Sequence, residues 1–128
     1  MNCIVVNDES LVRNALKTLI NKSKNLTLLA SFNNTFEASR FISENIVDLV
    51  FFDIQIDETR GYEFIKVIPH KTFVIFISGF SSTAIKTYQP DAINGSKSRF
   101  QKGIDLAKNY SKRMKKENSN IADDYFVI

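Results

Sequence analysis

The chain has 128 residues, of which 44% are hydrophobic, and its formal net charge is +3. This length and apolar content suit one domain with a sizeable core, and the chain is too short for two well-packed domains. The modest net charge does not indicate nucleic-acid binding. The single cysteine, Cys3, excludes a disulfide framework and a cysteine-rich metal site. The first apolar run breaks at Asn7-Asp8-Glu9, far short of a membrane span, so we expect a cytoplasmic protein without membrane contact.

The first third of the chain alternates between short apolar runs and amphipathic stretches. Cys3–Val6 is a predicted strand, and apolar residues from Leu11 to Ile20 then recur at helical spacing. Leu26–Phe32 is a second predicted strand, followed by the turn and cap residues Asn33, Asn34 and Thr35. The second helix is expected to turn Ala38, Phe41 and Ile42 inward.

The third apolar run, Val47–Gln55, is too short for a globular helix and carries the carboxylate of Asp53 near its end. A continuous apolar run of this length is typical of a strand buried on both faces of a parallel sheet. Ligands of such sheets bind beyond the carboxyl ends of the strands. Asp also ends many strands because it suits turns, so Asp53 by itself is either a functional acid or a turn residue.

The alternation continues with a short helix that ends at Pro69 and a fourth predicted strand, Thr72–Ile77, that stops at Ser78-Gly79. A weakly helical stretch, Ala84–Tyr88, then stops at Pro90. The residues expected inside the short helix are Phe64, Ile65 and Ile68. This rhythm predicts an α/β fold with a doubly wound parallel sheet, helices on both faces and right-handed crossovers.

The rhythm falters at Asn94–Ser98, a turn-forming polar segment where a fifth strand is expected. From Arg99 a long amphipathic helix is predicted, with basic residues from Lys108 to Lys116 on its solvated face. Residues 118–124 are linker-like, and Tyr125–Ile128 is strand-like. The apolar residues of the long helix recur at Phe100, Ile104, Ala107, Tyr110 and Met114. We therefore expect the fifth strand to be missing or replaced.

Asp8, Asp53 and Ser78 follow three predicted strands and are expected at one edge of the sheet, although each alone is equally consistent with a turn or a helix start. Together, Ile4–Glu9, Asp53 and Ser78-Gly79 resemble the receiver domain of two-component response regulators, which has a flavodoxin-like fold. The run Asp53-Ile54-Gln55-Ile56, and Phe76–Phe80 continuing to Pro90–Ile93, are similar to the LytTR (LytR/AlgR) branch of that family.

The resemblance implies that Asp53 accepts a phosphoryl group from a sensor histidine kinase, and that Ser78 hydrogen-bonds this group. It implies a Mg²⁺ ion held by Asp8, Asp53 and the backbone carbonyl of Gln55, and hard oxygen ligands suit this ion. Asn7 stands where the family usually has a second acid, so we expect it to act through a metal-bound water and to weaken Mg²⁺ binding. Lys97 is the candidate for the family's phosphate-binding lysine; the alternative is a solvated loop lysine.

The predicted domain division is a receiver over residues 1–117, followed by a linker and the start of a LytTR DNA-binding domain over 118–128. The resemblance implies a regulator that dimerises, reaches DNA only through that further domain, and has no enzymatic activity beyond self-phosphorylation and autodephosphorylation. The alternative is a degenerate receiver that acts as a phosphorylation-independent interaction module. A dehalogenase-like hydrolase is set aside because it needs an acid where Gln55 stands.

The shortened region leaves the edge of the fourth strand open, and an apolar parallel edge is a pairing hazard. One hypothesis is that Tyr125–Ile128, from the same or another chain, adds to this edge. The other is that the segment Asn94–Ser98 is an engineered loop replacement and the chain associates through exposed edges.

Overall fold

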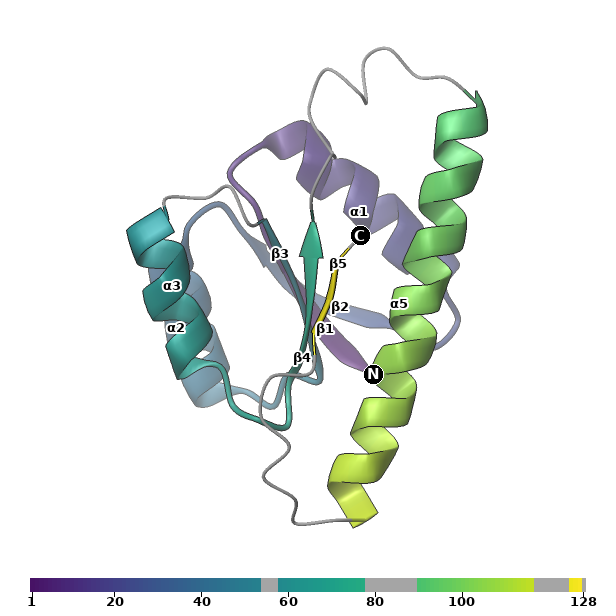
Figure 1. Ribbon diagram of the computed structural model, residues 1–128. Helices are drawn as coiled ribbons and strands as arrows, with labels where there is room; N and C mark the ends of the chain where they lie inside the picture. The colour runs from purple at the N-terminus through teal and green to yellow at the C-terminus, as the bar shows by residue number, and fades with distance from the viewer. Residues whose placement is uncertain (54–57, 78–89, 117–124, 128) are drawn as a thin grey trace.

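The computed structural model describes residues 1–53, 58–77, 90–116 and 125–127; within these, residues 58–62, 90–99, 114–116 and 125–127 are described by their backbone alone. Strands and helices alternate along the chain (Figure 1). In chain order the elements are β1 (Asn2–Val6), α1 (Ser10–Lys22), β2 (Thr27–Phe32), α2 (Thr35–Glu44), β3 (Leu49–Asp53), α3 (Glu58–Val67), β4 (Phe73–Ile77), α5 (Pro90–Lys116) and β5 (Tyr125–Val127).

The strands form one parallel sheet in the order β2-β1-β3-β4-β5. Helices α1 and α5 cover one face, and α2 and α3 cover the other (Figure 1). The prediction of a doubly wound parallel sheet is therefore confirmed. The last segment of the chain also occupies the edge of β4, as the first of the two hypotheses for that edge expected, and it does so within the same chain.

The two faces of the sheet are built from alternate residues of the same strands. On β3, Leu49 and Phe51 join the core under α1 and α5, whereas Val50 and Phe52 join the core under α2 and α3. All four side chains are almost completely buried. A strand that is apolar on both faces reads as a continuous apolar run, which explains the pattern of the third run.

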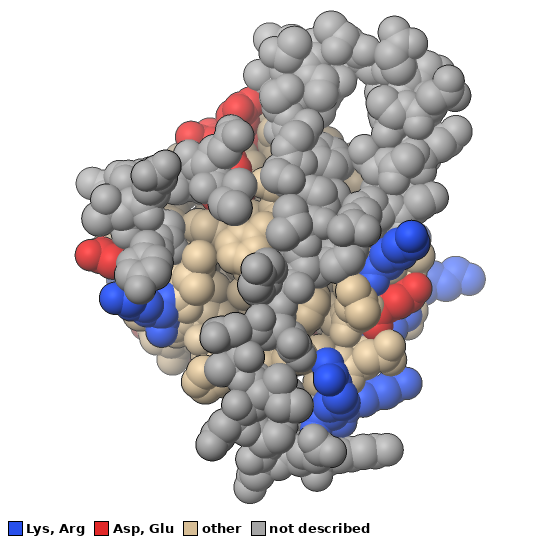
Figure 2. Space-filling model, viewed as in Figure 1, with Lys and Arg blue, Asp and Glu red and all other residues tan. Residues whose placement is uncertain are grey.

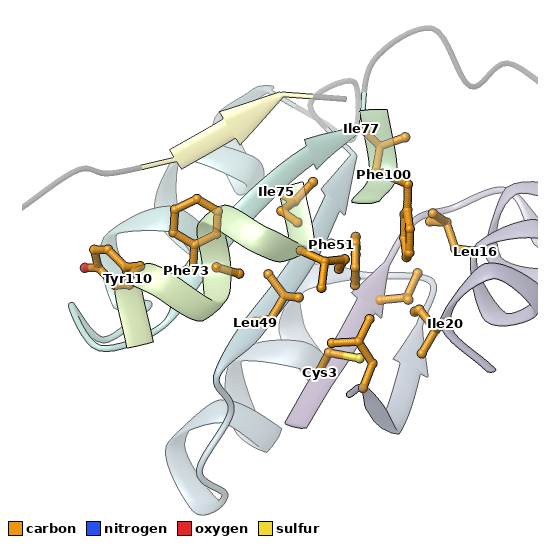
Figure 3. Packing of buried hydrophobic residues seen from close by; sticks show 14 of the residues in the cluster. Cys3, Leu16, Ile20, Leu49, Phe51, Phe73, Ile75, Ile77, Phe100 and Tyr110 are labelled. Atoms are coloured by element: carbon orange, nitrogen blue, oxygen red, sulfur yellow. The ribbon is translucent and has the colours of Figure 1, made fainter. Parts of the chain in front are cut away.

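Aromatic rings occur in both cores, and Figure 3 shows those of the core under α1 and α5. Phe51 stacks on Phe100 of α5, with ring centroids 5.5 Å apart and an interplanar angle of 8°. Phe52 packs on Phe64 of α3 on the other face, at 5.1 Å. At the far end of α5, the Tyr110 ring lies 5.3 Å from Phe73 and its hydroxyl donates a hydrogen bond to the His70 carbonyl. These contacts tie the long helix to β3 and β4.

Two local predictions were wrong. Ile65 was expected inside, but 39% of its surface is exposed, because Phe64 and the half-buried Ile68 take the inward positions of α3. Asn94–Ser98 was expected to form a turn before a helix starting at Arg99, but α5 begins at Pro90 and runs through this segment. Proline suits the first position of a helix because the amide hydrogen that it lacks would have no helical partner there.

The crossovers were also not all of the expected hand. The connections through α1, α2 and α3 are right-handed (Figure 1). The connection from β4 to β5 passes through α5 on the α1 face and is left-handed. The reason is that β5 comes after α5 in the chain, whereas the expected fifth strand would have preceded it.

Candidate functional site

The carboxyl edge of the sheet brings Asn7 and Asp53 together. Val6, the last residue of β1, pairs with Phe52, so Asn7 and Asp53, the residues that follow them, lie side by side at the ends of the two strands. The Asn7 Nδ2 atom donates a hydrogen bond of 3.2 Å to Oδ2 of Asp53. Asp53 is half-buried, while Asn7 is 1% exposed. The structure thus places Asp53 where the sequence predicted a functional acid.

The side-chain amide of Asn7 is oriented by a second hydrogen bond. Its Oδ1 atom accepts from the Glu9 backbone N–H at 2.7 Å, so the NH₂ group faces Asp53. The backbone of Asn7 is held as well, since its N–H donates to the Phe32 carbonyl at 3.0 Å. A buried amide that uses both ends in this way has a defined orientation. It presents a hydrogen-bond donor to the Asp53 carboxylate.

Sequence reasoning missed Arg13, which anchors the acidic loop after β1. Its Nη1 atom donates to the Asn7 carbonyl at 2.7 Å, and its backbone N–H donates to the Glu9 carbonyl at 3.0 Å. Arg13 lies one helical turn after Glu9, the residue that precedes α1. The sequence carries no local signal for this contact, because the Arg13 side chain binds a backbone carbonyl six residues earlier and does not pair with a side chain at helical spacing.

The other predicted site residues are only partly described. Asp8 is exposed in the loop that follows β1. Ser78 comes directly after β4, and Gln55 follows β3 by two positions, but both lie outside the described residues. Lys97 has a helical backbone within α5, so it does not end a strand as the resemblance required. Among the predicted site residues that the structure describes, Asn7 and Asp53 are in contact.

Acidic side chains lie around this edge together with Arg13, and α5 carries several basic side chains. Acidic side chains gather at the end of the molecule toward which the strands point, and Lys and Arg side chains gather beside α5 (Figure 2). Lys102, Lys112 and Arg113 are exposed on α5, which fits the prediction of a solvated basic face. The ring of Tyr110 also lies under the Arg113 guanidinium, 5.8 Å from it.

The described residues contain no group of three or more His, Cys, Asp or Glu side chains that could hold a metal ion. The predicted Mg²⁺ ligands are two carboxylates and a backbone carbonyl, a set that Mg²⁺ completes with water. The half-buried Asp53 and the exposed Asp8, which follows Asn7 in the chain, carry carboxylate oxygens, donors of the right chemistry. The residues present therefore fit a hard cation at this edge.

Comparison with known proteins identifies the family. The model of the response regulator receiver domain matches residues 3–95, and the chain belongs to this family. Protein MrkE of Klebsiella pneumoniae is 30% identical over 97 residues, which are 73% of this chain and 36% of that protein. The sensory transduction protein LytR of Staphylococcus saprophyticus is also 30% identical, over 73% of this chain and 38% of its own length. The resemblance to the LytR branch is thus confirmed.

Solved structures agree with the fold. The response regulatory domain of Klebsiella pneumoniae mrkE superposes with a TM-score of 0.60 at 26% identity, covering 91% of this chain and 100% of that one. The receiver domain of RcsB from Salmonella enterica gives a TM-score of 0.63 at 15% identity, which shows a similarity of fold alone. The chain spans less than half the length of the curated relatives described above. No helix among the described residues is long and apolar enough to cross a membrane.

Proposed function

We propose that Asp53 is the phosphoacceptor of this receiver domain. The observation that carries the proposal is the place of Asp53 at the carboxyl end of a buried strand, where its Oδ2 accepts from Asn7 Nδ2 at 3.2 Å. A phosphoryl donor would be attacked by an Asp53 oxygen, forming a new phosphorus–oxygen bond while the bond to the leaving group breaks. Such a transfer depends on positioning and on compensation of negative charge.

Mg²⁺ would be held by Asp8, Asp53 and the Gln55 carbonyl. When bound, the ion supplies positive charge that offsets the phosphoryl oxygens. Asn7 would reach it through a water held by the second lone pair of Oδ1, because Glu9 N–H uses the first. Its NH₂ group keeps the Asp53 carboxylate hydrogen-bonded, and its neutral amide brings no charge to the ion.

Two further residues complete the proposed phosphorylated state. The Ser78 hydroxyl would donate a hydrogen bond to a phosphoryl oxygen, since the residue directly follows the strand beside β3. Lys97, whose backbone belongs to α5, remains the proposed cation. A sensor histidine kinase is the proposed donor, and a DNA-binding domain that follows the receiver domain, working in a dimer, is the proposed output. The protein is proposed to act in the cytoplasm.

The test is phosphorylation by a small-molecule donor. The chain is incubated with acetyl phosphate and MgCl₂, and the intact mass is measured with and without EDTA. We expect one added phosphoryl group on the wild-type chain, none with EDTA and none on Asp53→Asn. Asp105→Asn, which changes an exposed carboxylate on α5, is the matched control and should be labelled like wild type. Equal labelling of Asp53→Asn and wild type would refute the assignment.

A further inference from the structure

The fifth position of the sheet is filled in an unusual way. Strand β5 has three residues and pairs with β4 through Val74 with Tyr125, Ile75 with Phe126, and Phe76 with Val127. It joins the sheet after the long helix, with eight residues, 117–124, between α5 and β5. In the chain, the strand that pairs with the β4 edge is therefore reached from β4 through α5 and residues 117–124.

The hand of this connection is opposite to that of the others. Strand order runs β3-β4-β5, so the chain moves in the same direction along the sheet from β3 to β4 and from β4 to β5. The first of these steps uses α3, and the second uses α5 on the opposite face (Figure 1). Helices on opposite faces give opposite hands for one direction of travel. The step through α5 is thus left-handed, as are only about 2% of such crossovers.

A left-handed connection is an unfavourable route for bringing β5 back to its own sheet. Right-handed crossovers dominate because a right-twisted strand feeding a helix packs back onto the sheet in that sense. Strand β5 is also as short as strands in globular proteins usually get. By contrast, the edge that it covers belongs to a strand made of apolar residues, Phe73–Ile77, whose outer backbone groups need a hydrogen-bonding partner. Pairing of the β4 edge with a strand therefore matters more than the connection through which that strand arrives.

We propose that the β4 edge is a strand-accepting site, and that it exchanges its own Tyr125–Val127 for the same segment of a second copy. In the exchanged dimer each β4 has the same parallel partner sequence, so the ladder is preserved. The left-handed connection disappears, because the strand that pairs with β4 no longer follows the α5 of that sheet. Domain swapping of an identical element is a low-cost route to a dimer.

The cost of exchange is the loss of an intramolecular partner. A segment tethered by a short linker has an effective concentration of the order of millimolar. The segment of a second copy competes with it only when the concentration of the chain approaches that value. We therefore expect the monomer in dilute solution and a growing dimer fraction as the chain concentration approaches about 1 mM. The dimer requires no phosphorylation, so its failure and the failure of the Asp53 assignment are separate results.

Disulfide trapping in full-length chains tests the exchange. One chain carries Val74→Cys and another carries Tyr125→Cys; the Cα atoms at these positions are ladder partners, at a spacing that a disulfide spans. The two are mixed at about 1 mM, incubated in mild urea, returned to buffer and oxidised. We expect a disulfide-linked heterodimer joining residues 74 and 125, identified by peptide mass. Native Cys3 is buried and stays out of the reaction.

Two control experiments decide the outcome. In the first, Lys24→Cys, an exposed site after α1, replaces Tyr125→Cys and reports random collision. The exchange is supported if the residue 74–125 product exceeds this control at least tenfold, and overturned if the two are equal. In the second, both cysteines are placed in one chain at micromolar concentration, where an internal disulfide is expected. Its absence would overturn the proposal by removing the β4–β5 register on which it rests.

Discussion

At the scale of single residues, Asn7 is in direct contact with the proposed phosphoacceptor, Asp53. Its NH₂ group donates to Asp53 and its oxygen accepts from the Glu9 N–H, so the amide links the ends of β1 and β3 without adding charge. An acid in its place would face Asp53 as a like charge, which is unfavourable unless a cation lies between them. In the proposed Mg²⁺ site, this amide would supply a hydrogen bond to Asp53 in place of a charged ligand.

The substitution Asn7→Asp tests this role of the amide. We expect Mg²⁺ affinity to rise about tenfold, because the new carboxylate brings negative charge close to the ion. Without Mg²⁺ the free energy of unfolding should fall by about 1–3 kcal/mol, since the bond to Asp53 becomes a repulsion. Calorimetric titration with MgCl₂ measures the first effect and urea unfolding in EDTA the second. Asn7→Ala is the control: it should lose stability without gaining affinity, and equal affinity in both variants would contradict this account.

Cys3 shows how deeply β1 is buried. The thiol is 0% exposed, and burial raises the pKa of Cys3 from 9.0 to about 12. The folded state therefore keeps its proton at a pH where the unfolded chain would lose it. Stability linked to Cys3 is fully present below about pH 9 and is lost as the pH rises from 9 toward 12.

We expect the native chain to react with a thiol reagent at pH 8 at least a hundredfold more slowly than the chain in 6 M urea, because burial blocks access and suppresses the thiolate. The absorbance of the released thiol chromophore follows both reactions. Lys24→Cys supplies an exposed thiol for comparison and should react rapidly in the native state. Equal native rates for the Cys3 thiol and the residue 24 thiol would show that β1 opens readily.

At the scale of elements, α5 is the main departure from expectation. The helix spans Pro90–Lys116 and includes Asn94-Gly95, a pair that is typical of a turn. Four of its apolar residues, Phe100, Ile104, Ala107 and Tyr110, are buried at helical spacing as predicted. Burial of this stripe against β3 and β4 stabilises a helix that can then extend over a segment of poor propensity.

Gly95→Ala distinguishes the helix from the turn. In a helix, alanine should raise the free energy of unfolding by about 0.5–1 kcal/mol, because glycine is the weaker helix former. In a turn that places residue 95 in the left-handed region, the same change should lower it. Urea unfolding followed by circular dichroism measures the difference. Gly103→Ala cannot serve as the control, because Gly103 is buried. The control is Asn109→Ala, at an exposed position of α5.

At the scale of the whole molecule, the two cores share one set of strands. Residues of β1, β3 and β4 alternate between the core under α1 and α5 and the core under α2 and α3. Loss of the sheet would remove both cores, so the faces should not unfold separately. A chain of this size normally unfolds in one cooperative step.

We expect Ile104→Ala and Phe64→Ala, one on each face, to cost about 2–5 and 3–5 kcal/mol of unfolding free energy respectively. Each should shift a single urea transition, and the double variant should show nearly additive losses because the two sites share no partner. Leu106→Ala, at a position 45% exposed on α5, should change stability little. Two separate transitions, by circular dichroism or tyrosine fluorescence, would contradict a shared core.

The sequence by itself determined the alternating elements, the two-faced burial of β3 and the acid at its end. These follow from local periodicity and from where apolar runs stop, which a single chain displays directly. Only the tertiary structure decided the orientation of the Asn7 amide, the anchoring by Arg13, the helical state of Asn94–Ser98 and the place of Tyr125–Val127. Each depends on partners distant in sequence or on burial of a neighbouring stripe, and propensity yields where such packing is strong.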